Sequence, residues 1–177
     1  MMATGNAWEA QPELQDELII QYSFDSAQMQ RISQYSINPD FDYWTRKETT
    51  GIIETGSKTW MHPFRSNQYN FTEVAAFPSV ELPLELGKTW SSGLSIYDGW
   101  GAWANSTLNN SYEVVDFEVL EAGFGNLEAW HIRAITRADF GVSVHDFWYN
   151  EEYGFIRMFI KNYKGQMLQF DLAEVKG

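Results

Sequence analysis

The sequence contains no cysteine, and this absence excludes several kinds of chemistry. Disulfides, thiolate metal sites and a cysteine nucleophile are all ruled out. A chain of 177 residues can bury a stable core without cross-links, so the missing cysteines do not indicate a compartment. Long apolar runs are missing too, because no stretch approaches the roughly 20 residues that a transmembrane helix needs.

Positive charge is scarce. The chain has 12 Lys and Arg against 24 Asp and Glu, which gives a formal net charge of −12. Such a chain lacks the positive field that attracts phosphate backbones or anionic lipid headgroups. We therefore expect no nucleic-acid partner.

Sequence signatures of known catalytic sites are also missing. There is no GxSxG elbow, phosphate loop, dinucleotide fingerprint, calcium loop, HxH or HExxH. Carboxylates are plentiful, but pairing two of them as a glycosidase acid and base requires a separation that a sequence does not give. The sequence therefore predicts no catalytic residue, no metal site and no cofactor, and it favours a non-enzymatic protein without excluding an enzyme.

Aromatic residues are abundant, at 16% of the chain, and bulky rings suit a pleated, half-buried sheet. After a first strand at 17–24, strand follows strand from Phe41 onward, with Gly and Pro breaks at hairpin spacing. We expect an all-β fold, an antiparallel β-barrel or strongly curved half-barrel of about ten strands. Residues 1–15 read as a loose arm and residues 16–177 as a single β domain. Residues 26–33 have the spacing of either a short helix or a continued strand.

One strand, at 155–161, is apolar on both faces. Such a strand is covered on both sides, or its second face lines a cavity. The second reading makes Phe155 and Phe159 candidate ligand-binding residues. Strict alternation places Ile156, Met158 and Ile160 on one face, and Phe155 and Phe159 with Arg157 and Lys161 on the other.

A predicted hairpin that turns at residues 138–141 brings together two strands that carry histidine, arginine and aspartate side chains. If the turn is symmetric, Arg133 faces Asp146 and His131 faces Trp148 on one surface. The group would contain an imidazole, a guanidinium and a carboxylate. It is either a catalytic or metal-binding site or a structural cross-strand ion pair.

The segment TWMHPFR places a second histidine at a rigid bend. Pro63 forces His62 into an extended conformation, so His62 and Arg65 would flank the bend and could receive an anionic group. The alternative is a strand end packed by Trp60 and Phe64. A further hypothesis combines His62 with the other two histidines, at positions 131 and 145, in one metal or hydrolytic site.

The loop YDGWGAW, at 97–103, has the most unusual local composition in the chain. Rings displayed on a flexible loop commonly stack on sugars or close over an apolar ligand. Tyr97, Trp100 and Trp103 are therefore candidate ligand-binding residues. The alternative is that Trp100 and Trp103 fold back as a lid on the end of the barrel.

Several of these segments together resemble a known group of proteins. They are HPFR (62–65), AFPSVELPLELGKTW (76–90), GWGAW (99–103), GNLEAWHI (125–132) and the closing run from FWYNEEYGF to EV (147–175). The set resembles uncharacterised exported or lipid-anchored proteins of Bacteroidota-type Gram-negative bacteria. Its closing run also resembles periplasmic half-barrel proteins of the lipoprotein-carrier kind. The resemblance implies a periplasmic or cell-envelope location and a curved half-barrel, without an established activity.

Residues 1–15 carry neither a signal peptide nor a lipid-accepting cysteine, so a targeting segment has been removed or the protein is cytosolic. Our leading hypothesis is a non-enzymatic cell-envelope binding module that holds an apolar or lipid-like ligand in the curved sheet. One alternative is a carbohydrate-binding accessory protein that uses the loop at 97–103. Another is a structural or protein-interaction domain. The sequence does not indicate an oligomeric state.

Overall fold

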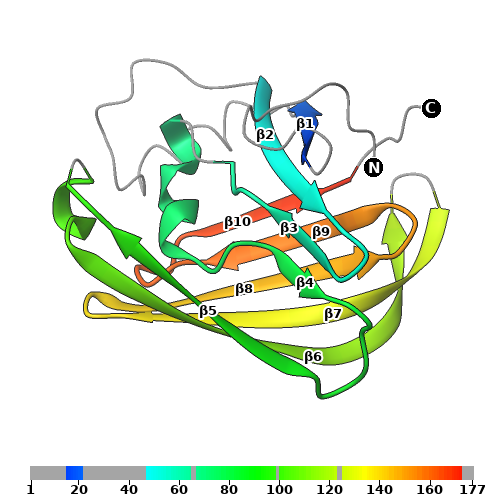
Figure 1. The fold of residues 1–177 in the computed structure, drawn as a ribbon. Helices are drawn as coiled ribbons and strands as arrows, with labels where there is room; N and C mark the ends of the chain where they lie inside the picture. The colour runs from blue at the N-terminus through cyan, green and yellow to red at the C-terminus, as the bar shows by residue number, and fades with distance from the viewer. Residues whose placement is uncertain (1–14, 22–46, 65–66, 99, 123–124, 173–177) are drawn as a thin grey trace.

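The computed structural model describes residues 15–21, 47–64, 67–98, 100–122 and 125–172. Within these ranges, ten strands form two antiparallel sheets, with two short 3₁₀ segments, η2 (Asn67–Val74) and η3 (Gly101–Trp103) (Figure 1). The strands are β1 (Gln15–Gln21), β2 (Lys47–Glu54), β3 (Lys58–Met61), β4 (Ser79–Glu81), β5 (Thr89–Ile96), β6 (Ser106–Ala122), β7 (Gly125–Ala138), β8 (Gly141–Asn150), β9 (Gly154–Lys161) and β10 (Met167–Asp171).

Both sheets are meanders in which neighbours in sequence are neighbours in space. The smaller sheet has the order β1-β2-β3-β4, and the larger has the order β10-β9-β8-β7-β6-β5. The larger sheet curves beneath the smaller one and η2 (Figure 1). In the described part of the chain β5 and β10 are its two edges, so the sheet is open. The all-β prediction is confirmed in its half-barrel form, and the closed barrel is not formed.

Some sequence predictions fall outside the described residues. The helix or strand at 26–33 does, and so does nearly all of the arm at 1–15. The first strand begins at Gln15, two residues earlier than expected, and its predicted end at Phe24 also lies outside.

The prediction of strand after strand is wrong between Pro63 and Pro78, where the chain forms η2 instead. A proline has no N–H to give to a sheet ladder, so the two prolines isolate this segment from β3 and β4. The Thr72 hydroxyl donates to the Phe64 carbonyl at 2.7 Å. This hydrogen bond joins Phe64, at the start of the segment, to η2. The apolar side chains of η2 that are then buried are Tyr69, Phe71 and Val74.

A single core lies between the inner face of the six-stranded sheet and a cover, by which we mean β2–β4, η2 and the described residues that join them. Phe147 on β8 is fully buried, as are Met61 and Phe64 from the cover. The rings of Phe64 and Tyr69 pack on Phe170 of β10, with centroids 5.0 Å and 5.4 Å away. The cover thus fills the inner face of the sheet with the chain's own side chains.

Buried polar groups also join the two layers. The Thr59 and Tyr149 hydroxyls are hydrogen-bonded at 3.0 Å, and the Tyr112 hydroxyl donates to the Phe77 carbonyl at 3.0 Å. Buried polar groups are costly unless they are paired, so these bonds favour one arrangement of cover and sheet.

A β-bulge interrupts the pairing of β8 with β9. Trp148 pairs with Arg157, but Tyr149 pairs with Phe155, which leaves Ile156 as an extra residue. One extra residue reverses the faces of everything beyond it. Ile156 therefore points to the outer face, while Phe155 turns into the core.

The bulge corrects the interpretation of β9. Phe155 does not share a face with Phe159: Phe155 is buried beside Phe147 and Tyr149, whereas Phe159 is half-buried opposite Asp146 on the outer face. The two phenylalanines cannot line one cavity. The strand is apolar on both sides because each side has its own packed cluster.

The turn between β7 and β8 depends on Gly141, whose φ of 141° is rarely adopted by other residues. A Cβ at this position would lie 2.9 Å from the Cβ of Tyr163. We predict that Gly141→Ala lowers the free energy of unfolding by about 1–3 kcal/mol in urea denaturation. Gly93→Ala is the control, because a Cβ at Gly93 meets only the Leu108 carbonyl, at 3.8 Å. Equal stability of the two variants would contradict this prediction.

Candidate functional site

The β7–β8 hairpin turns at 138–141 as the sequence predicted, and its register brings the expected side chains together. Arg133 pairs with Asp146, and His131 pairs with Trp148. All four side chains lie on the outer face of the six-stranded sheet. The prediction of an imidazole, a guanidinium and a carboxylate on one surface is confirmed.

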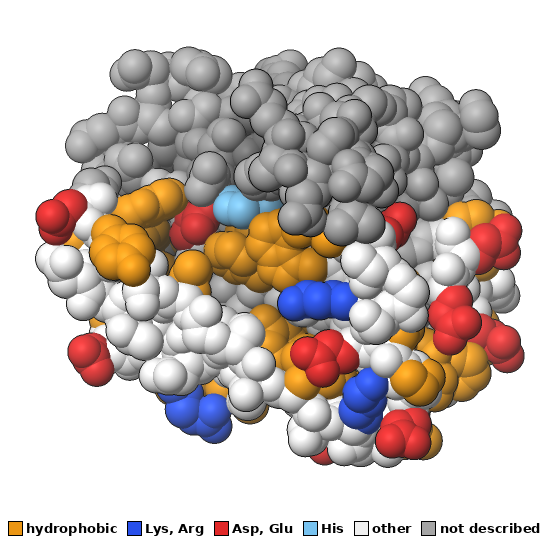
Figure 2. All heavy atoms as spheres, in the orientation of Figure 1, with side chains coloured by type: hydrophobic (Ala, Val, Ile, Leu, Met, Phe, Trp, Pro, Cys, Tyr) orange, Lys and Arg blue, Asp and Glu red, His pale blue; other side chains and the backbone are white. Residues whose placement is uncertain are grey.

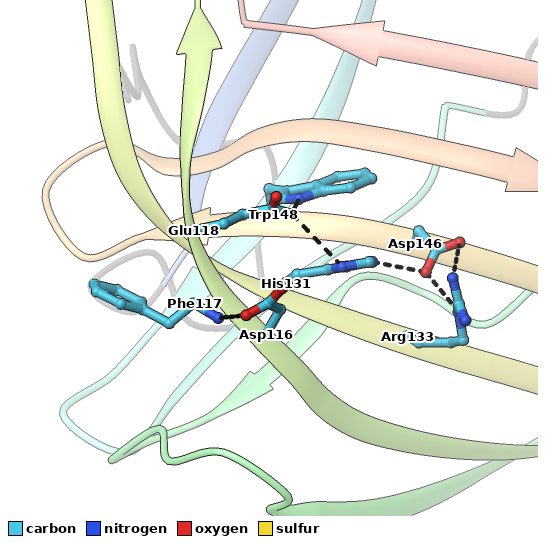
Figure 3. A network of polar contacts seen from close by, with 7 residues as sticks. All are labelled: Asp116, Phe117, Glu118, His131, Arg133, Asp146 and Trp148. Carbon is cyan, nitrogen blue, oxygen red and sulfur yellow. Dashed lines mark hydrogen bonds and ion pairs between the residues drawn. The ribbon is translucent and has the colours of Figure 1, made fainter.

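These side chains form a continuous polar network with Glu118 of β6 (Figure 3). Asp146 Oδ1 lies 2.8 Å from both His131 Nε2 and Arg133 Nε, and its Oδ2 accepts from Arg133 Nη2 at 3.4 Å. Trp148 Nε1 donates to Glu118 Oε1 at 2.7 Å, and His131 Nδ1 lies 3.7 Å from the same oxygen. The His131 and Trp148 rings stack with centroids 4.4 Å apart.

Asp146 is the centre of the network. Burial raises the pKa of its carboxyl, but hydrogen bonds from His131 and Arg133 and their positive charge outweigh burial, so the pKa lies below its ordinary value. The group is therefore an ionised acceptor and not a proton donor at neutral pH. Both of its oxygens accept hydrogen bonds from side chains of β7, an arrangement suited to holding β7 and β8 together.

The network continues onto β9 and β10. Arg157 lies over the Trp148 ring, 5.9 Å from its centroid, and forms an ion pair with Asp171. Side chains of five adjacent strands are thus connected across the outer face. We interpret this group as a structural clamp, which was the second of the two readings that the sequence left open.

The three histidines do not form one site. His131 is on the outer face, whereas His145 is buried on the inner face, where its Nδ1 donates to the Ala76 carbonyl at 2.7 Å. His62 lies in the cover, with Nε2 3.8 Å from a carboxylate oxygen of Glu73. Across the described residues, no three His, Asp or Glu side chains are arranged to hold a metal ion.

His145 is held in its neutral form by its surroundings. Burial lowers its pKa to about 4, against smaller opposite effects of the Ala76 hydrogen bond and the Asp146 charge. Because Nδ1 carries the proton that is given to Ala76, Nε2 is a bare acceptor, and it is buried without a hydrogen-bond partner. The imidazole acts here as a neutral link between sheet and cover.

The sequence suggested an anion site at the bend formed by His62 and Arg65. Arg65 lies outside the described residues, so its predicted role at this bend is not tested. His62 Nδ1 is 2.9 Å from the Pro63 carbonyl, and its Nε2 is 3.8 Å from a carboxylate oxygen of Glu73. A carboxylate at this position disfavours an anionic ligand.

The loop at 97–103 displays one ring and buries another. Tyr97 is 76% exposed, Trp100 is half-buried, and Trp103 is 5% exposed. Trp103 Nε1 donates to the Tyr163 hydroxyl at 3.0 Å. Trp103 therefore serves as the lid of the alternative reading, and Tyr97 and Trp100 are the rings of this loop that a ligand could reach.

A further cluster of rings, which sequence reasoning missed, lies where the cover meets the β5 side of the sheet. His62 packs against Trp60 and Phe77, with ring centroids 5.9 Å and 5.1 Å away. Trp90 stacks on the Tyr112 ring, with the two ring centroids 5.3 Å apart. Figure 2 shows hydrophobic side chains gathered on this side of the molecule. We call this half-buried group the aromatic rim; its members are Trp60, His62, Phe77 and Trp90.

The sheet holds the aromatic rim in place through the chain that leads from η2 to β4. His145 binds the Ala76 carbonyl, and Tyr112 binds the next carbonyl, that of Phe77. One sequence signal could have found the rim, since Trp60 and Trp90 end the two similar segments SKTW and GKTW. That echo indicates two strand starts, and the fold places both at the rim.

Comparison of the chain with protein-family models, with curated proteins and with solved structures found no match. Function must therefore be argued from the geometry. The helical segments in the described ranges are all too short or too polar to cross a membrane.

The interpretation as a clamp predicts that removing the charge of Asp146 lowers the stability of the fold. Asp146→Asn should lower the free energy of unfolding by about 1–3 kcal/mol, because a neutral amide cannot satisfy both His131 and Arg133. Asp116→Asn is the matched control, since Asp116 is exposed and an amide oxygen can still accept from the Phe117 N–H. Urea denaturation of both variants measures the difference, and equal small losses would refute the clamp.

His145 predicts a pH dependence. Its folded pKa, about 4, lies below the ordinary value of 6.5, so between these values the unfolded chain binds more protons. The contribution to stability is complete above pH 6.5 and is lost as the pH falls toward 4, by about 3 kcal/mol in all. His145→Gln should remove this part of the pH dependence. If wild type and variant lose stability in parallel from pH 6.5 to 4, the prediction is wrong.

Proposed function

We propose that the chain is a non-enzymatic binding module that holds an apolar or lipid-like ligand on the aromatic rim. The observation that carries this proposal is the packing of Trp60, His62 and Phe77 on one another while all three remain partly exposed. Within the described residues, Trp60 and Phe77 are not part of the core cluster. Exposed, clustered apolar rings commonly mark a contact surface.

The rim is a better place for the ligand than the interior of the curved sheet. Between sheet and cover, the volume is lined by buried side chains of this chain, such as Phe147, Tyr69 and Met61. A ligand there would have to displace packed residues, each of which contributes about 1.5–3 kcal/mol by its burial. A ligand on the rim displaces only water.

The charge around the rim selects the kind of ligand. Glu73 Oε1 lies 3.8 Å from His62 Nε2, and the chain as a whole has a net charge of −12. A neutral apolar group is therefore favoured over an anionic one. The location that we propose, the periplasm or cell envelope, rests on the resemblance of sequence segments described above.

A second candidate is carbohydrate contact through the loop at 97–103. It is favoured by the 76% exposure of Tyr97, which is unusual for so large a ring. The buried position of Trp103 narrows this candidate to Tyr97 and Trp100.

The test is binding of a neutral apolar fluorophore, N-phenyl-1-naphthylamine, and its displacement by a fatty alcohol. Phe77→Ser should weaken fluorophore binding about tenfold or more, because it removes one ring from the contact surface. Tyr97→Ser is the matched control, since it removes an equally large ring outside the rim. Thermal unfolding confirms that both variants are folded.

Two results would contradict the proposal. One is fluorophore binding by Phe77→Ser that equals wild type, and the other is no binding by wild type. Binding to a glycan array that is lost in Tyr97→Ser and retained in Phe77→Ser would establish the carbohydrate candidate instead.

A further inference from the structure

Strand β5 is an edge of the six-stranded sheet that carries no protection against pairing. Its sequence, TWSSGLSI, contains no charged residue and no proline, and its pairing with β6 is continuous and without a bulge. Nothing among the described strands pairs with its other side. The exposed residues of β5 are Thr89, Ser91, Ser92, Gly93 and Ser95.

The other edge strands of the two sheets are shorter than β5, and each contains a charged residue. Edge strands are usually kept from pairing with other chains by short length or by charge. β4 has three residues and includes Glu81, and β10 has five and includes Asp171. β1 has seven and includes Asp16 and Glu17. β5 is the longest of these edges, with eight residues, and the one without a charge.

The backbone of β5 presents a regular row of donors and acceptors at its open side. The Val114 N–H donates to the Lys88 carbonyl at 2.9 Å, so the carbonyl of Lys88 points toward β6. Backbone groups alternate in direction along an antiparallel strand. Those that point away from β6 therefore belong to Thr89, Ser91, Gly93 and Ser95.

We propose that β5 pairs antiparallel with β5 of a second copy of this chain, about a two-fold axis at Gly93. This register sets Gly93 opposite itself and Ser91 opposite Ser95. Each of these residues directs its backbone outward, so every pair exchanges hydrogen bonds. The two six-stranded sheets then form one continuous sheet through an interface in which the same patch serves both copies.

Charge supports a second copy as the occupant. Two chains of net charge −12 repel each other, and this repulsion is weakest where the surfaces that meet are uncharged. β5 meets this condition, and the outer-face row next to it on β6 is also uncharged: Thr107, Asn109 and Ser111.

Disulfide trapping tests the register directly, because the chain has no cysteine of its own. Residues in a hydrogen-bonded antiparallel pair have Cα atoms about 5.5 Å apart, within the range that a disulfide spans. A side chain fits at Gly93, where a Cβ meets only a carbonyl at 3.8 Å. Gly93→Cys should therefore form a covalent dimer on mild oxidation. Ser111→Cys, exposed on the neighbouring strand β6, is the control and should form no covalent dimer.

Sedimentation equilibrium tests the assembly without a cross-link. Wild type should have twice the 20.5 kDa mass of one chain. Ser91→Pro should be monomeric, since proline removes an outward N–H and leaves the β5–β6 hydrogen bonds intact. Phe77→Ser should remain dimeric, which separates this test from that of the rim.

A monomeric wild type at the highest soluble concentration would overturn the proposal. So would cross-linking of Gly93→Cys no faster than that of Ser111→Cys, or a wild-type dimer that survives Ser91→Pro. A monomer that instead binds an uncharged extended peptide in a Ser91-dependent way would assign the edge to a different partner and would equally refute the dimer.

Discussion

The inner face of the six-stranded sheet has to be covered, and the rest of the structure follows from that requirement. Large apolar side chains on β7, β8 and β9 point to this face, and leaving them in water would cost about 1.5–3 kcal/mol for each. The cover supplies the missing layer through Met61, Phe64 and Tyr69. Apolar surface that remains exposed on this side includes the aromatic rim, where the cover ends beside β5, and Phe117 and Val119 of β6. The ligand site that we propose is therefore on the rim and not in the interior.

Polar groups decide how the cover is oriented. His145 and Tyr112 rise from the inner face and bind the consecutive carbonyls of Ala76 and Phe77, which places the Phe77 ring in the rim. On the opposite face, the clamp around Asp146 joins neighbouring strands and stiffens the sheet from which those two side chains project. The charged network, although it has the composition of an active site, supports the site without belonging to it.

Local patterns in the sequence predicted the features that depend on neighbouring residues. The turn at Gly141 sets the register of its hairpin, so the pairing of Arg133 with Asp146 and of His131 with Trp148 followed from counting residues along two strands. The bulge at Ile156 could not be predicted in this way, because one extra residue leaves the apolar pattern unchanged while it reverses the faces. The rim was missed for a different reason: Trp60 and Trp90 lie on different sheets, and the contact of Tyr112 with Phe77 that joins their clusters depends on how the two layers pack.

The central claim is that cover and sheet form one closed core. Hydrogen exchange followed by mass spectrometry tests this claim most directly, since it measures the opening free energy of each segment. The account predicts that peptides from η2 and from β8 exchange with the same opening free energy and lose protection together in denaturant. Exchange of η2 at a much lower opening free energy, while β8 stays protected, would contradict it, because the inner face would then open to ligands without unfolding of the sheet.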